Sequence, residues 1–182
     1  MSEELVVRHC APTLAGLKTA NMFTCAYESE GEMRDQLREW NHKLGEKGVR
    51  TIPLRYKDGK ALVYVYRPDR LRADLCDRMA CELLQERGYP CETPCRCLSQ
   101  LVSRLQETSN VPHEIGLFLG YPPEDVSGFL ENRVPHSCPG PWRVYGNVEE
   151  AKVRFDQYKK CTKSYCEHWK KGCALEQLTV KS

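Results

Sequence analysis

Two β-rich runs separated by a tight turn constrain the fold of this chain most strongly. Residues 49–56 and 61–67 are rich in β-branched and aromatic side chains and flank the tetrapeptide 57–60, which reads KDGK. An Asp-Gly pair between such runs favours a short turn whose twist matches that of antiparallel strands. Pro53 has no N–H to donate to a ladder, so its strand is expected at a sheet edge. The sequence therefore predicts an antiparallel hairpin.

Periodic apolar patterns on either side of the hairpin predict an α+β fold. A strand is expected over residues 21–27. Apolar residues then recur three or four positions apart, as one face of a helix requires, at Met33, Leu37, Trp40 and Leu44. After the hairpin, a second stripe runs from Leu71 to Leu84 and stops at Gly88. The order strand, helix, hairpin, helix is that of the first five elements of a ferredoxin-like unit.

The remaining signals predict a helical insertion before a last strand. Thr93 and Pro94 are typical of a helix start, and two short helices are expected over 113–119 and 123–131. Alternation predicts a strand over 142–145, followed by a helix over 149–171. We therefore expect one domain over residues 1–182, with a mainly antiparallel sheet of about four strands covered by helices and an insertion over about 94–131.

Composition excludes several classes of protein. Lys and Arg number 27 against 25 for Asp and Glu, a net charge of +2 that indicates no nucleic-acid partner. The first residues are acidic and lack the apolar stretch of an export signal, and the longest apolar run, 61–66, is far shorter than a membrane-spanning helix. We expect a soluble, cytoplasmic protein without a membrane partner. Since the eleven cysteines are an odd number, most of them are then expected to be free thiols.

The first candidate site contains His9, Cys10 and Lys18. A short helix is expected from Pro12 to Leu17, so Cys10 would precede its N-terminus, where the helix dipole lowers the pKa of a thiol. Cys10 is the candidate nucleophile and His9 its catalytic partner, while Lys18 can bind an anionic ligand or cap the helix. The alternative is a buried, inert cysteine beside a loop histidine.

The second candidate site lies around the two short helices. His113 and Glu114 are the candidate catalytic pair, as proton carrier and base, and Tyr121 and Asp125 are the candidate ligand-binding residues. The alternative is ordinary helix initiation, since acidic residues favour helix N-termini and no second histidine completes an HExxH zinc motif. We expect segments 9–18 and 113–125 to meet and line one pocket.

Two groups of cysteines raise the question of a metal. One contains Cys91, Cys95 and Cys97, and the other contains Cys161, Cys166, His168 and Cys173. Both groups offer thiolate ligands, but neither spacing matches a zinc or iron–sulfur motif, and structural cysteines are the alternative. Phosphate-binding loops and the GxSxG nucleophile motif are absent as well. The sequence assigns no metal and no cofactor.

The segments HCAPTLAGLK, HEIGLFLGYPPEDVSGF and PWRVYG carry a resemblance to a known family. With them the chain resembles the uncharacterised domain-of-unknown-function family 3793 of anaerobic Firmicutes, over nearly its whole length. The resemblance implies a setting in redox or iron metabolism and a flavodoxin-like redox partner, and it transfers no activity. The leading hypothesis is thus a thiol- or metal-associated accessory protein or small enzyme. The alternative is a non-catalytic small-ligand-binding or protein-interaction module.

Overall fold

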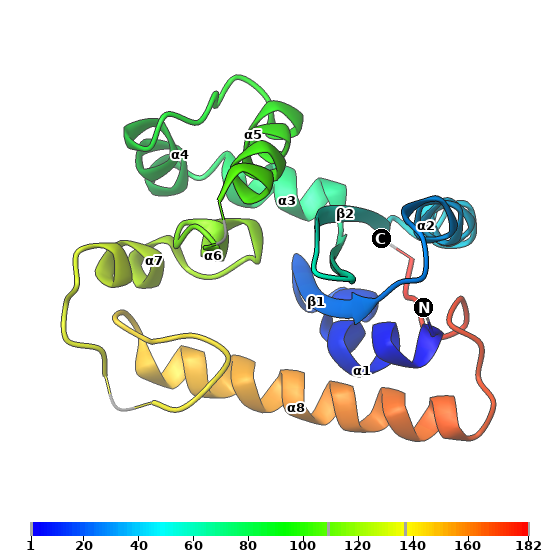
Figure 1. Cartoon of the computed structure of the whole chain (residues 1–182). Helices are drawn as coiled ribbons and strands as arrows, with labels where there is room; N and C mark the ends of the chain where they lie inside the picture. The colour runs from blue at the N-terminus through cyan, green and yellow to red at the C-terminus, as the bar shows by residue number, and fades with distance from the viewer. Residues whose placement is uncertain (1, 109, 137, 182) are drawn as a thin grey trace. The chain divides into compact units, whose positions relative to one another are not determined.

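The predicted hairpin is present in the computed structural model, which describes residues 2–108, 110–136 and 138–181. Strands β2 (Arg50–Lys57) and β3 (Lys60–Tyr66) pair antiparallel around the Asp-Gly turn. Strand β1 (Ala20–Ala26) pairs antiparallel with the other side of β3, which gives the sheet order β1-β3-β2 (Figure 1). Pro53 therefore lies on an edge strand, as predicted, beside a register shift between Pro53 and Arg55.

Helices α1 (Glu3–Leu14) and α2 (Glu30–Gly45) share a hydrophobic core with one face of this sheet. The sheet contributes alternate residues to that core, because successive side chains of a strand point to opposite faces. On β3 these residues are Ala61, Val63 and Val65, all fully buried. The predicted stripe of α2 is confirmed, since each of its four apolar residues is at most 3% exposed.

Contacts among the residues divide the chain into two compact units. The first unit comprises the chain up to Arg70 together with the residues from Lys160 onward, and the second comprises Leu71–Lys159. Helix α8 (Val148–Lys170) begins in the second unit and ends in the first. The predicted insertion, 94–131, falls inside the second unit but does not coincide with it.

The second unit contains helices and irregular segments in the part that the structure describes. Its helices are α3 (Pro68–Leu75, from Leu71 onward), α4 (Arg78–Glu86), α5 (Pro94–Glu107), α6 (Ile115–Phe118), α7 (Pro123–Leu130) and the start of α8. The predicted cap of α5 is confirmed, because the Thr93 hydroxyl accepts a hydrogen bond from the Arg96 backbone N–H. Gly120 closes α6 with a φ of 73°, a conformation that favours glycine at a helix end.

The fourth strand expected over 142–145 is wrong. Buried and exposed side chains do alternate in this segment, since Trp142 and Val144 are buried while Arg143 is exposed. However, the Tyr145 backbone N–H, which a sheet ladder would need, is donated to the Asp125 carboxylate instead. Within residues 2–108, 110–136 and 138–181 the sheet thus has three strands, and no ferredoxin-like unit is completed.

Two helix boundaries also differ from the prediction. Pro12 does not begin a helix but lies in the last turn of α1. That helix starts nine residues earlier, at Glu3, with Ser2 at the N-cap position. The single helix expected over 71–84 is two helices, because Asp77 caps α4 by accepting a hydrogen bond from the Ala80 N–H at 3.1 Å. An Asp side chain competes with the helix backbone in this way and favours a cap over a helix interior.

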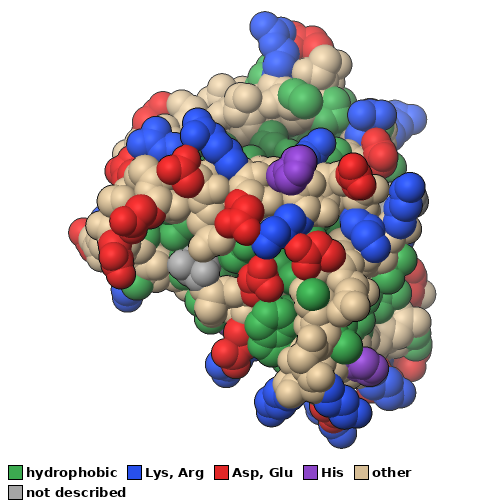
Figure 2. Space-filling model, turned by 90° about the vertical axis from the view of Figure 1, so that its right-hand side faces the viewer, with side chains coloured by type: hydrophobic (Ala, Val, Ile, Leu, Met, Phe, Trp, Pro, Cys, Tyr) green, Lys and Arg blue, Asp and Glu red, His purple; other side chains and the backbone are tan. Residues whose placement is uncertain are grey.

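The surface carries both signs of charge. On the face drawn in Figure 2, Lys and Arg side chains alternate with Asp and Glu, and neither sign forms one continuous patch. Among the described helices, none combines the length and the apolar character needed to cross a membrane.

Candidate ligand-binding site

Cys10 occupies the C-terminal part of α1 and not a helix start, so the expected lowering of its pKa by a helix N-terminus is wrong. It is fully buried, and burial raises the pKa of its thiol, with a smaller opposing effect of Lys18. Lys18 is 5% exposed, and burial lowers the pKa of its ammonium group to about 8, partly offset by Cys10. His9 is exposed and stacks on Phe23, with ring centroids 5.6 Å apart. The catalytic roles of His9 and Cys10 therefore stay predictions, and the helix dipole does not support them.

A buried arginine binds backbone carbonyl groups in the segment HCAPTLAGLK. Arg67 is 2% exposed and donates hydrogen bonds to the carbonyl oxygens of Thr13, Leu14 and Val180, each at 2.7 Å. A cation at the C-terminal end of a helix satisfies carbonyls that have no partner within the helix. The middle of this segment therefore has a structural role in joining α1, the residue that follows β3 and the last residues of the chain.

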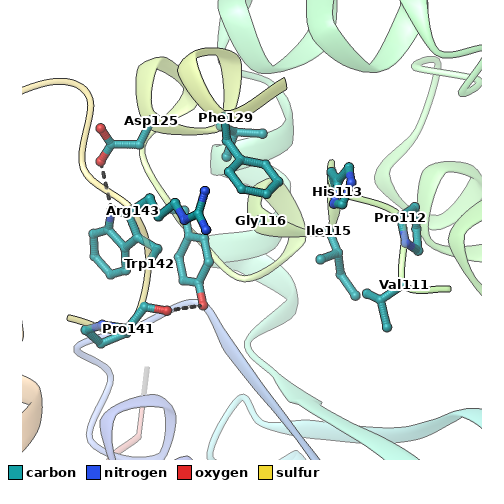
Figure 3. Close-up of a pocket in the computed structure, with 12 residues that line it drawn as sticks. Val111, Pro112, His113, Ile115, Gly116, Asp125, Phe129, Pro141, Trp142 and Arg143 are labelled. Carbon is teal, nitrogen blue, oxygen red and sulfur yellow. Dashed lines mark hydrogen bonds between the residues drawn. The ribbon is translucent and has the colours of Figure 1, made fainter. Parts of the chain in front are cut away.

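The second unit contains an open pocket of about 320 Å³. Its walls are largely aromatic and aliphatic, with Tyr121, Phe129 and Trp142 as the aromatic residues. Tyr121 stacks on Trp142, with ring centroids 4.6 Å apart, and the Tyr121 hydroxyl donates to the Pro141 carbonyl at 3.5 Å. These contacts fix the aromatic wall on the side of Trp142 (Figure 3).

Two basic side chains lie at the same pocket. The guanidinium carbon of Arg143 is 5.4 Å from the centroid of the Phe129 ring, and the His113 ring meets Phe129 edge to face at 4.9 Å. In the view of Figure 3, Arg143 and His113 approach Phe129 from opposite sides. Both side chains are exposed, so water or a ligand reaches them. The arrangement offers flat apolar surface beside hydrogen-bond donors.

Asp125 holds the Trp142 wall in place. It is 4% exposed, and its Oδ2 accepts the Trp142 indole N–H at 2.7 Å. Its Oδ1 accepts the backbone N–H groups of Tyr145 and Gly146, also at 2.7 Å. The residue lines the pocket, but three donors from its own chain already occupy the carboxylate, and its predicted role in ligand binding stays a prediction. Asp125 is therefore a positioning residue for Trp142.

Glu114 is buried and bonded to residues outside the pocket. Its Oε1 accepts the Tyr89 hydroxyl at 3.0 Å and pairs with the Arg104 guanidinium at 3.2 Å, and Arg104 also donates to the carbonyl of Arg87. Glu114 is 6% exposed and does not line the pocket that His113 lines. Glu114 instead connects α5, α6 and the segment after α4, and its catalytic pairing with His113 stays a prediction.

Small residues allow the close packing around the pocket. A side chain at Gly116 would have its Cβ 2.9 Å from Val126 and 3.0 Å from Tyr121, so only glycine lets α6 and α7 approach this closely. This contact accounts for one glycine of the segment HEIGLFLGYPPEDVSGF. Sequence analysis found Tyr121, Asp125 and His113 but missed Phe129, Trp142 and Arg143. A signal for all three was present, since Phe129 ends the segment HEIGLFLGYPPEDVSGF and the other two lie in the segment PWRVYG.

Residues 9–18 and 113–125 belong to different units. The pocket is lined by residues of the second unit alone. A site shared by the two segments stays a prediction.

All eleven cysteines lie in the described part of the chain and carry thiols. Cys95 is exposed while Cys97 is buried, so these two do not face the same way. Among the described residues, no group of three or more His, Cys, Asp or Glu side chains is arranged to hold a metal ion.

The class of protein defined here is an α+β protein with an aromatic pocket in a helical unit. The chain belongs to the family described as protein of unknown function DUF3793, whose model matches residues 6–179. No curated protein and no solved structure matches the chain.

Proposed function

We propose that this protein binds a small, planar, aromatic anion in the pocket of its second unit and acts as a ligand-binding module. The observation that carries the proposal is the placement of Arg143 and His113 on either side of Phe129, next to the Trp142 wall. Flat aromatic walls favour a ring system, because offset or edge-on ring contacts add to the gain from burying apolar surface. The guanidinium of Arg143 favours a carboxylate or phosphate, which it can bind through two parallel hydrogen bonds.

The size of the pocket limits the ligand. Ligand pockets usually enclose about 300–1,000 Å³, so a pocket of about 320 Å³ lies at the lower end of that range. We therefore infer a ligand of one or two fused rings. The pocket is open to solvent, which places the charged group of the ligand at the rim, near Arg143, and the rings against the apolar walls.

The pocket favours binding over catalysis. A general base needs a carboxylate or imidazole that is available to a substrate proton. The His113 imidazole is available, but no carboxylate is free to act with it, because Asp125 is already held by three N–H donors and Glu114 is used in an ion pair with Arg104. A thiol- or metal-associated role in redox or iron metabolism, a flavodoxin-like partner and a cytoplasmic location stay predictions of the sequence.

Calorimetric titration with 2-naphthoate tests the proposal, with 2-naphthamide as its uncharged counterpart. We expect 2-naphthoate to bind more tightly than the amide. In Arg143→Gln this preference should fall about five-fold, the equivalent of roughly 1 kcal/mol for an exposed charge pair. The matched control is Arg133→Gln, an exposed arginine that pairs with Glu131 and does not line the pocket, and it should leave both affinities unchanged.

Two results would contradict the proposal. One is the absence of heat or saturation with either probe. The other is equal affinity for acid and amide in the unmodified protein, which would mean that the basic side chains do not select an anion.

A further inference from the structure

We propose that Cys81, Cys91 and Cys97 form a redox-active thiol site, in which Cys91 is the shared thiol and forms a reversible disulfide with one of its two neighbours. The site is independent of the aromatic pocket and does not rest on the proposed ligand. It differs from the group Cys91, Cys95 and Cys97 that spacing alone singles out, because Cys81 takes the place of Cys95.

Hydrogen bonds bring the three cysteines together. Cys81 lies in the first turn of α4, Cys91 in the segment between α4 and α5, and Cys97 in the first turn of α5. The Cys91 thiol lies 3.6 Å from the Cys81 carbonyl oxygen, and the Cys97 thiol lies 3.1 Å from the carbonyl oxygen of Pro90, the residue before Cys91. Cys91 is thus fixed between the starts of two helices.

The three thiols also affect one another electrostatically. Burial raises the pKa of Cys91 to about 12, and hydrogen bonds and charge interactions with Cys81 and Cys97 contribute to the same shift. For Cys97, burial raises the pKa while the hydrogen bond from Cys91 lowers it. Such mutual effects arise only between groups that lie near one another, so they agree with the hydrogen bonds in placing Cys91 beside Cys81 and Cys97. A disulfide requires the two sulfurs to approach to about 2.05 Å with their Cβ atoms about 3.5–4.5 Å apart, which neighbouring cysteines reach with small movements of the chain.

The segment that carries Cys91 is held in position from both sides. Tyr89 donates to Glu114 at 3.0 Å, and the Tyr89 ring lies 4.1 Å beneath the guanidinium carbon of Arg104. Arg104 also bonds the Arg87 carbonyl. Because these contacts keep Cys91 beside the two helix starts, little chain has to move for a sulfur–sulfur bond to form.

The chemistry balances with a peroxide as the oxidant. The Cys91 sulfur and one neighbouring sulfur lose their protons and two electrons, and one S–S bond forms. Hydrogen peroxide accepts the two electrons, its O–O bond breaks, and the two protons leave in two molecules of water. The remaining thiol can then attack the new disulfide and release the other cysteine, a thiol–disulfide exchange that needs no further oxidant. Cys81 and Cys91 are partly exposed, so the oxidant reaches them before the buried Cys97.

Peptide mapping of the oxidised full chain tests the site. Cleavage after arginine and lysine places the three cysteines in separate peptides, 79–87, 88–96 and 97–104. The Cys95→Ser variant leaves Cys91 as the one thiol of the middle peptide. This variant is treated briefly with a small excess of hydrogen peroxide, blocked with iodoacetamide in denaturant, and digested without reductant.

We expect peptide 88–96 to be recovered joined to 79–87 or to 97–104, two hydrogens lighter than the separate peptides, and released by dithiothreitol. The exposed Cys76 provides the internal control and should be alkylated in full. Cys91→Ser should abolish both linked species. Circular dichroism shows whether Cys91→Ser folds. If it does not, the peptide map of oxidised Cys95→Ser still shows whether Cys91 forms a disulfide with Cys81 or Cys97.

Three outcomes would overturn the proposal. Peptide 88–96 is alkylated in full after oxidation, it is joined mainly to a cysteine outside the trio, or the linkage runs between two chains on a non-reducing gel.

Discussion

Replacing Asp125 by Asn removes the carboxylate that holds the Trp142 wall while keeping the size of the side chain. The carboxylate accepts three N–H groups, one from the Trp142 indole and two from the backbone of Tyr145 and Gly146. Asn has one oxygen and one NH₂ group, so whichever way it turns, its NH₂ faces an N–H donor. We therefore expect Asp125→Asn to destabilise the second unit and to disorder the Trp142 wall.

The magnitude follows from the three hydrogen bonds. One is lost, which costs about 2 kcal/mol for a bond to a charged acceptor, and two become neutral bonds, which costs roughly 1 kcal/mol each. Removing a buried charge returns about 1–2 kcal/mol of the penalty for taking the carboxylate out of water. The net loss in the free energy of unfolding is about 2–3 kcal/mol.

Urea unfolding followed by tryptophan fluorescence measures this loss, and hydrogen exchange at the Tyr145 and Gly146 amides locates it. Glu124→Gln is the matched control, because Glu124 is exposed in the same first turn of α7 and loses the same charge. That change should cost no more than about 0.5 kcal/mol through the helix dipole. The reasoning is refuted if both variants are equally stable, or if the two amides exchange at the same rate in Asp125→Asn as in the unmodified protein.

Three further outcomes concern Arg67, the order in which cysteines are labelled, and Lys18. Arg67→Met should lower the free energy of unfolding by about 3–5 kcal/mol, because it leaves buried carbonyls without donors; a loss below about 1 kcal/mol in urea unfolding would contradict this. Near neutral pH, N-ethylmaleimide should label the exposed Cys76 first and the buried Cys10 last, and peptide mapping that finds Cys10 among the early sites would contradict its burial. Burial lowers the pKa of Lys18 to about 8 from 10.5, so the unfolded chain binds this proton more tightly. The stability of the unmodified protein relative to Lys18→Met should therefore rise as the pH increases from 8 to 10.5, and a flat difference in urea unfolding would contradict the shift.

Short-range sequence patterns correctly predicted several structural elements. The Asp58-Gly59 turn, the stripe around Trp40 and the Thr93 cap each depend on residues close together in the sequence, and all three are confirmed. Pro12 was misjudged because a proline that fits the first turn of a helix also occurs in the last turn of α1. There its ring packs in a fully buried segment, which offsets the lost backbone hydrogen bond.

Long-range contacts account for what the sequence did not predict. The alternation at Trp142 and Val144 is typical of a strand, yet the partner of this segment is the Asp125 side chain, 17 residues before Trp142. Likewise, Cys81 lies ten residues before Cys91 and meets it only because the segment after α4 folds back onto the first turn of that helix. No spacing rule connects such residues, since tertiary packing alone brings them together.

The nitrogen–proton resonances of the tryptophan indoles provide the most direct test of the aromatic-anion site. The chain has three tryptophans, and Trp142 is the one that lines the pocket, whereas Trp40 and Trp169 belong to the first unit. On titration with 2-naphthoate, the account predicts a saturable shift of the Trp142 indole resonance while the other two stay in place. A Trp142 resonance that does not move, or three resonances that move together, would contradict it.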